Sequence, residues 1–128
     1  MFVEDIVTIL NTAGQGVAGV SIFWGTKSEP TGDGPFITII ETGGTGPKRV
    51  HNAAPYRRPS AQIVVRAKGQ DVARAKADAV WNALDQKRNL TVNGNWYVSI
   101  DTKQEPFDMG LDGAGRIRFA FNIECVKR

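Results

Sequence analysis

The fold is decided by one stretch of the chain, YRRPSAQIVVRAKGQDVARAKADAVWNAL, which covers residues 56–84. From Ala61 to Lys68 the pattern alternates between two sides, as expected of a β-strand whose faces meet different surroundings. After Gly69 the apolar residues recur with the period of a helix. This predicted helix has one apolar stripe, which consists of Ala73, Ala77, Val80, Trp81 and Leu84. The stretch therefore predicts a strand followed by an amphipathic helix, and the stripe is predicted to lie in the core together with Ile63 and Val65.

Another helix is predicted over residues 2–12. Its apolar stripe consists of Phe2, Ile6, Ile9 and Leu10. Glu4 and Asp5 fall in its first turn, where acidic side chains interact favourably with the helix dipole.

Four further segments are predicted to be strands, over residues 17–26, 36–42, 96–101 and 115–127. The last has the strongest pattern, because apolar residues from Ile117 to Cys125 occupy every second position. Asn93-Gly94 predicts a tight hairpin turn before the strand at 96–101, and residues 103–114 are predicted to form a loop. The order α-β-β-β-α-β-β predicts an α+β fold, with two helices packed on a mostly antiparallel sheet of about five strands.

Length and composition place the chain in an ordinary class. A chain of 128 residues fits a single domain spanning residues 1–128, and its 41% hydrophobic and 23% charged residues are typical of globular proteins. The one cysteine cannot form an internal disulfide. No apolar run approaches the roughly 20 residues needed to span a bilayer, and the N-terminal residues are acidic where a signal peptide needs basic ones. We expect synthesis in the cytoplasm, no secretion by a signal peptide and no membrane partner.

A long segment at about residues 43–59, which contains glycines and prolines, is predicted to be a loop with a use of its own. It carries four basic residues and no acid, whereas the whole chain has a net charge of only +3. Such a segment can meet a phosphate backbone or an acidic protein surface, and solvated loops are also commonly charged. The candidate interaction residues in it are Lys48, Arg49, His51, Tyr56, Arg57 and Arg58.

The predicted strand at 36–42 is apolar on both faces, which favours cover on both sides or a place in an interface. The face opposite Ile37 and Ile39 is the candidate subunit interface, and it consists of Phe36, Thr38 and Ile40.

Signatures of catalysis and of cofactor or metal binding are not found. Residues 43–48 are like a phosphate-binding loop, but Pro47 removes a backbone N–H that an anion needs. Residues 108–113 have Gly110 where a calcium loop requires an oxygen ligand. His51 has no cysteine or carboxylate near it in the sequence, and Cys125 is in register with core residues. We therefore predict that the chain is not an enzyme and uses no cofactor and no metal.

Three stretches together resemble the small tail terminator, or tail completion, proteins at the neck of long-tailed bacteriophages, which are also called minor capsid proteins. The first is the strand and helix within residues 59–84, and the second is the hairpin LTVNGNWY at residues 90–97. The third is Pro106 followed by the closing strand GRIRFAFNIECV at residues 115–126. The predicted helix at residues 2–12 also fits the start of such proteins.

The resemblance implies a structural protein of the virion tail or neck that assembles as a ring, usually a hexamer. Such a ring caps the tail tube, stops its polymerisation and joins it to the head, so the implied partners are further copies of the chain, the tail tube protein and the connector or stopper protein. Non-specific contact with DNA in the lumen is also implied. Two alternatives stay open: another neck component, such as a connector or stopper, and a small nucleic-acid-binding module. Binding to tube ends or to DNA-filled heads distinguishes the first, and a steep dependence on salt identifies the second.

Overall fold

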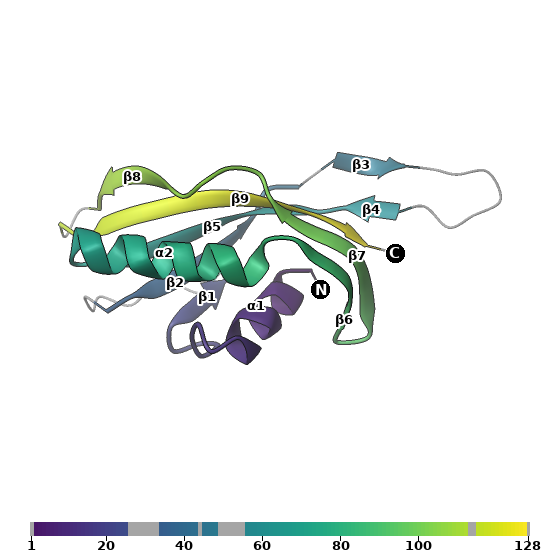
Figure 1. The fold of residues 1–128 in the computed structure, drawn as a ribbon, viewed down its shortest axis with the longest axis horizontal. Helices are drawn as coiled ribbons and strands as arrows, with labels where there is room; N and C mark the ends of the chain where they lie inside the picture. Colours follow the sequence, from purple (N-terminus) through teal and green to yellow (C-terminus); the bar gives the residue numbers. More distant parts are fainter. Residues whose placement is uncertain (1, 26–33, 44, 49–55, 113–114, 128) are drawn as a thin grey trace.

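The computed structural model describes residues 2–25, 34–43, 45–48, 56–112 and 115–127, with side chains omitted for residues 45–48. Two helices, α1 (Phe2–Thr12) and α2 (Gln70–Leu84), accompany a mixed nine-stranded sheet (Figure 1). The strands are β1 (Ile22–Trp24), β2 (Phe36–Glu41), β3 (Thr45–Lys48), β4 (Tyr56–Arg58), β5 (Ser60–Ala67), β6 (Lys87–Val92), β7 (Asn95–Thr102), β8 (Phe107–Leu111) and β9 (Ile117–Lys127).

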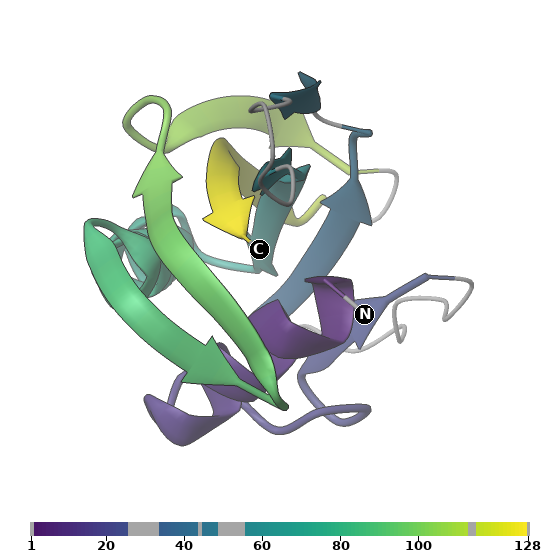
Figure 2. The ribbon, with the colours of Figure 1, turned by 90° about the vertical axis from the view of Figure 1, so that its right-hand side faces the viewer.

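The long strand β9 is the centre of the sheet. Along one side it pairs antiparallel with β5, from Ala67 opposite Ile117 to Ser60 opposite Glu124, and then with β4. Its other side pairs with β8 at the start of β9 and with β7 at its end. The sheet continues from β5 to β2 and β1, from β7 to β6, and from β4 to β3. Seen end-on, it is strongly curled (Figure 2).

The α+β class is confirmed, but the predicted sheet of five mostly antiparallel strands is too small and too simple. β1 and β2 run parallel, so the sheet is mixed. Two extra strands, β3 and β4, lie in the segment predicted to be a loop at 43–59, and β8 lies in the predicted loop at 103–114. The predicted hairpin at Asn93-Gly94 is present, and its first arm is the additional strand β6.

The core lies between the curled sheet and the two helices. Ile37, Ile63 and Phe121 point from β2, β5 and β9 into one buried cluster, which also contains the apolar stripes of α1 and α2. Trp81, predicted to be core, is only partly buried, because its indole N–H reaches outward to the backbone oxygen of Gln104 at 2.9 Å. In the described parts of the chain, neither helix is long and apolar enough to cross a membrane.

The residues at the two ends of α2, Gly69 and Asp85, explain where the helix begins and how its end is attached. Gly69 is the N-cap residue, and its side chain, a hydrogen atom, leaves the first backbone N–H groups without a side-chain acceptor there. Asp71 supplies an acidic group in the first turn. At the other end, Asp85 accepts hydrogen bonds from the backbone N–H of Thr102 at 3.2 Å and from its hydroxyl at 2.7 Å. These bonds attach the end of α2 to β7.

The predicted strand at 17–26 is much shorter in the structure, where only Ile22–Trp24 forms β1. The residues before it make turns, in which the backbone oxygen of Val17 accepts N–H groups from Val20, Ser21 and Ile22. Val20 is 66% exposed, although a regular strand over 17–26 would place it on the same face as the fully buried Ile22. Local turn hydrogen bonds therefore replace sheet pairing over this part of the segment.

Candidate interaction surfaces

The described strands of the predicted basic segment, β3 and β4, form an antiparallel hairpin at one end of the molecule (Figure 1). Arg57 of β4 is opposite Lys127 at the end of β9. Lys48 belongs to β3 and is paired with Tyr56, while Arg49 and His51 lie outside the described residues. The β3–β4 hairpin thus brings Lys48 and Tyr56–Arg58 of the candidate set into neighbouring positions on the backbone.

Part of the positive charge at this end is balanced. One carboxylate oxygen of Glu124 lies 3.8 Å from Nη1 of Arg58, and the other lies 3.5 Å from Nζ of Lys103. The side chain of Arg57 is exposed, and the ammonium of Lys127 lies 5.8 Å from the centre of the Tyr97 ring. Because Glu124 serves two of the four cations Arg57, Arg58, Lys103 and Lys127, this described group of side chains keeps a net positive charge.

The candidate subunit interface lies on the sheet face away from the helices. Ile40 is 46% exposed, whereas Phe36 and Thr38 are half-buried. The Phe36 ring packs edge-on against Phe23 at 5.9 Å, and the guanidinium of Arg66 lies 5.0 Å from its centre. Contacts within the chain therefore cover much of Phe36, and Ile40 is the member of the set most available to a partner.

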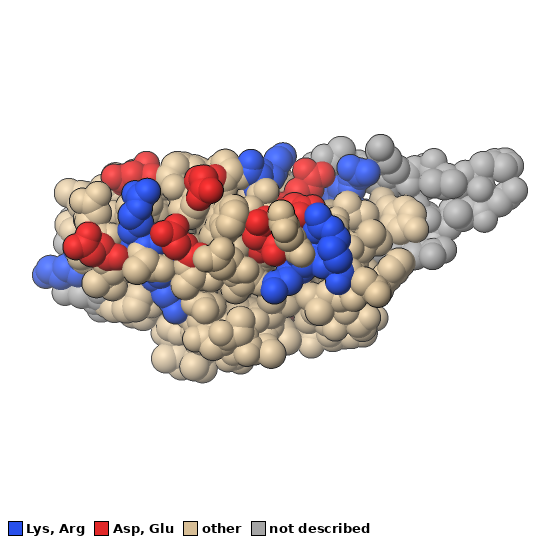
Figure 3. Space-filling model, in the orientation of Figure 1, with Lys and Arg blue, Asp and Glu red and all other residues tan. Residues whose placement is uncertain are grey.

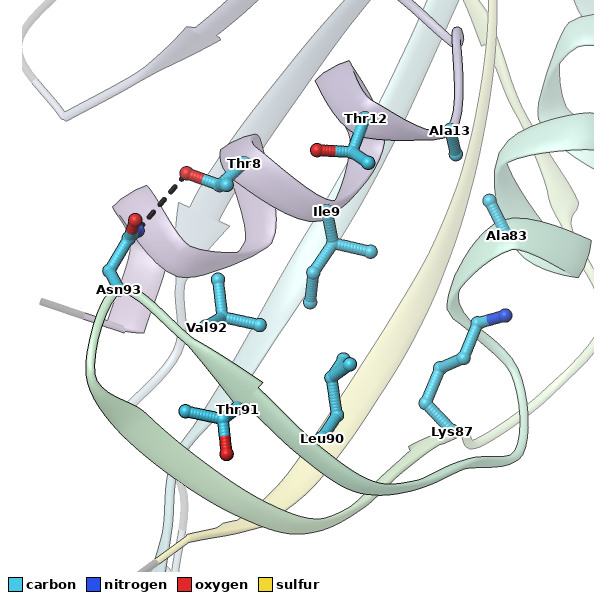
Figure 4. Close-up of a pocket in the computed structure, with 10 residues that line it drawn as sticks. All are labelled: Thr8, Ile9, Thr12, Ala13, Ala83, Lys87, Leu90, Thr91, Val92 and Asn93. Atoms are coloured by element: carbon cyan, nitrogen blue, oxygen red, sulfur yellow. Dashed lines mark hydrogen bonds between the residues drawn. The ribbon is translucent and has the colours of Figure 1, made fainter.

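A half-open apolar groove lies between α1, the end of α2 and β6 (Figure 4). Its volume is about 440 Å³. Ile9 of α1 forms one wall, Leu90 and Val92 of β6 form the opposite wall, and Ala83 of α2 closes one end. Among the described residues that line it, Lys87 is the one ionisable side chain.

Beside this groove, a buried carboxylate joins α1 to the β6–β7 hairpin. Asp5 is fully buried, and it accepts hydrogen bonds from the amides of Asn93 at 3.0 Å and Asn95 at 2.9 Å, and from the Tyr97 hydroxyl. The Asn93 amide also contacts the Thr8 hydroxyl at 3.1 Å (Figure 4). Burial, together with the bond to Asp5 and the charge of Asp5, raises the pKa of Tyr97 above its ordinary value, so its hydroxyl remains a donor.

Sequence reasoning placed Asp5 in the first turn of a helix but missed that it is a buried acceptor. A signal was present, because Asp5 is three residues after Phe2 and four before Ile9, which places it on the apolar stripe. It also missed β8, although Phe107, Met109 and Leu111 alternate with polar or small residues. Gly110 and the preceding Pro106 obscured that pattern.

Of the residues considered for catalysis or metal binding, Cys125 is described, whereas His51 lies outside the described residues. Cys125 is buried, and burial raises the pKa of its thiol to about 12, which makes it unreactive as a nucleophile. Over the described ranges, no group of three or more His, Cys, Asp or Glu side chains is placed to hold a metal ion.

Comparison with known proteins gives the class to which this fold and these surfaces belong. The family model described as bacteriophage tail terminator protein matches residues 9–128. The chain therefore belongs to the bacteriophage tail terminator family, and the resemblance found in its sequence is confirmed. It is a structural component of a phage tail. No curated protein matches the chain.

Solved structures share the fold at low sequence identity. A chain from the virion of a native gene transfer agent particle is 14% identical, with a TM-score of 0.67 over 98% of this chain and 92% of that one. A second solved chain is 12% identical, with a TM-score of 0.57 over 98% of this chain and 95% of that one. At these identities the likeness concerns the fold alone.

Proposed function

We propose that this chain caps the finished tail tube as a closed ring and provides the surface through which the tube is joined to the head. The observation that carries this proposal is the family match, which extends over residues 9–128. It is supported by the likeness of the fold to a chain of a gene transfer agent virion. No catalytic step is part of this function.

A ring of identical copies needs two different patches on each copy, because its contacts run head to tail. The chain presents separate surfaces of this kind. The β3–β4 end is basic, the groove between α1 and β6 is apolar, and the outer face of β2 exposes Ile40. In the proposed ring, which we expect to be a hexamer, neighbouring copies use apolar surfaces and leave the basic end for other partners.

The basic end is proposed as the surface that meets the next component during joining. Lys48, Arg49, Arg57 and Arg58 contribute four positive charges per copy, so six copies would place about +24 around the ring. A field of that size attracts either the acidic rim of a tube or DNA that passes through the lumen.

The test replaces Lys48, Arg49, Arg57 and Arg58 with Ser. The expected result is a normally folded protein that still assembles but gives fewer joined particles, because surface charges contribute little to folding. The urea midpoint of the variant reports folding, and electron microscopy counts joined particles, free tails and free heads in an assembly reaction. A control for lost surface charge, Lys68→Ser with Arg74→Ser, removes two positive charges near the start of α2, away from the β3–β4 end.

Unchanged joining in the fourfold variant contradicts the role of the basic end. Binding of the unaltered protein to DNA-filled heads and not to tube ends would contradict the capping function itself and favour a connector or stopper.

A further inference from the structure

The edge strand β8 exposes an unusual amount of apolar surface. Phe107 is 40% exposed, Met109 is 37% exposed and Leu111 is 62% exposed. Within the described chain β8 pairs with β9 alone, so its other edge is unpaired. An exposed apolar edge strand is a template for pairing with another chain, and soluble proteins usually cover or charge such edges.

The groove between α1 and β6 offers an apolar wall to such a strand. Its volume of about 440 Å³ greatly exceeds the roughly 30 Å³ of one water molecule, so it can receive apolar side chains. The strand that forms one wall, β6, is also an edge strand among the described residues, since it pairs with β7 alone. β6 has six residues and β8 has five, so the two edges match in length.

The two surfaces are also complementary in charge. Lys87 is the one ionisable residue that lines the groove, where the described lining contains no acid. β8 carries Asp108 between Phe107 and Met109, and Glu105 shortly precedes the strand. The register of β8 against β9 shifts between Asp108 and Gly110, so Asp108 and Leu111 lie opposite Phe119 and Ile117 on one face, whereas Phe107 lies opposite Ala120 on the other. An approach of the first face to the groove brings Asp108 toward Lys87 and Leu111 toward the apolar wall.

We propose that β8 of one copy docks along β6 of the next copy and places Leu111 in the groove, with Asp108 toward Lys87. A single copy cannot make this contact with itself, because β8 pairs with the start of β9 whereas β6 joins, through β7, its end (Figure 1). A contact between two different surfaces leaves one of each unused in a pair of copies, so further copies can add, and a ring closes where the rotation between neighbours allows it. The contact rests on the proposed ring and specifies how its neighbours meet.

The first test is cross-linking between two variants of the full chain, each with one cysteine added to the buried Cys125. Thr12→Cys places a thiol at the groove and Met109→Cys places one on β8; both positions are exposed. Cys125 does not compete, because it is buried and its thiol stays protonated. A mixture of the two variants, alone or bound to isolated tail tubes, is treated with a short bismaleimide. We expect a cross-linked dimer from the mixture, and none when Asp78→Cys, on the exposed side of α2, replaces Thr12→Cys.

The second test exchanges the charges across the contact. Lys87→Glu alone and Asp108→Lys alone are each expected to weaken self-association by at least about tenfold in analytical ultracentrifugation or tube binding. The two changes in one chain are expected to restore self-association, because each contact then pairs a negative residue 87 with a positive residue 108. Far-ultraviolet circular dichroism checks that each variant folds.

The outcomes distinguish failure of the β8–groove contact from failure of the proposed ring. Rings that form on tubes without cross-linking between position 12 and position 109, or without rescue by the charge exchange, overturn the β8–groove contact and leave the capping function standing. Absence of any assembly, in solution and on tubes, overturns both.

Discussion

Asp5 attaches the first helix to the rest of the molecule through a single carboxylate. Its oxygens accept hydrogen bonds from Asn93, Asn95 and Tyr97, which follow it by 88, 90 and 92 residues. A buried carboxylate is tolerated only when its oxygens accept hydrogen bonds, and here three donors provide these bonds. The network therefore decides the position of α1 over the β6–β7 hairpin, and with it the shape of the groove.

We predict that Asp5→Ala lowers the free energy of unfolding by roughly 3 kcal/mol, because it leaves buried donors without an acceptor. Urea denaturation measures the change. Asn11→Ala is the control, since Asn11 is exposed on the same helix and should change stability by less than about 0.5 kcal/mol. A similar midpoint for both variants would contradict the structural role of Asp5.

Tyr97 gives the network a dependence on pH. Its pKa is raised in the folded state, first by burial and then by Asp5, above an ordinary value of 10.0. The neutral phenol is thus favoured by folding, so this stabilisation is complete below pH 10 and is lost as the pH rises from there towards the folded pKa.

The unaltered chain should therefore lose about 1.4 kcal/mol more stability than Tyr97→Phe between about pH 8 and pH 11. Urea denaturation of both chains at the two pH values measures the difference. Titration of Cys125 occurs in both and cancels. Equal losses would show that the Tyr97 hydroxyl does not keep its proton through folding.

At the scale of an element, the turn that leads into β1 depends on Gly16. A Cβ atom at this position would lie 2.7 Å from Oγ of Ser21 and 2.8 Å from Cγ1 of Ile22. Neither neighbour can yield easily, because the Ser21 hydroxyl accepts the N–H of Val17 and Ile22 is fully buried. Only glycine fits this close approach without a shift of the turn.

We predict that Gly16→Ala destabilises the fold by about 1–3 kcal/mol through overpacking. Gly34→Ala is the matched control, because its added methyl would find its nearest neighbour, Cζ of Phe36, at 3.6 Å. Thermal unfolding of the two variants decides the point. Equal melting temperatures would mean that the turn adapts to the extra methyl group.

The elements whose apolar residues recur with a clear period could be predicted from the sequence. The short strands that depend on pairing with distant residues could not. The range of α1 and the strand-helix unit β5–α2 follow from local patterns that packing preserves. β3, β4 and β8 are short, contain or adjoin glycine and proline, and owe their existence to partners distant in sequence, such as Lys127 for β4. Propensity in a short segment does not report such long-range pairing.

Of the candidate surfaces, one could be predicted from the sequence and another could not. The charge of the segment containing Arg57 and Arg58 is a property of composition and was visible in the sequence. The groove was not, because its walls come from α1, α2 and β6, and only the tertiary arrangement brings Ile9 near Leu90. A surface assembled from three elements leaves no local pattern.

At the scale of the whole molecule, the fold separates its surfaces. Acidic and basic side chains are mixed over α2 and the upper strands, whereas the lower surface in Figure 3 is largely free of charge. The β3–β4 hairpin extends one end, and the apolar edge β8 lies toward the other (Figure 1). Such a distribution suits a subunit that binds its own copies through one set of surfaces and other partners through another.

The most direct test of the capping function is cryo-electron microscopy of isolated tail tubes incubated with the purified protein. We predict a single closed ring with cyclic symmetry at one end of each tube, and no further growth when free tube protein is added. Protein bound along the tube wall, or at its end without cyclic symmetry, would contradict the account.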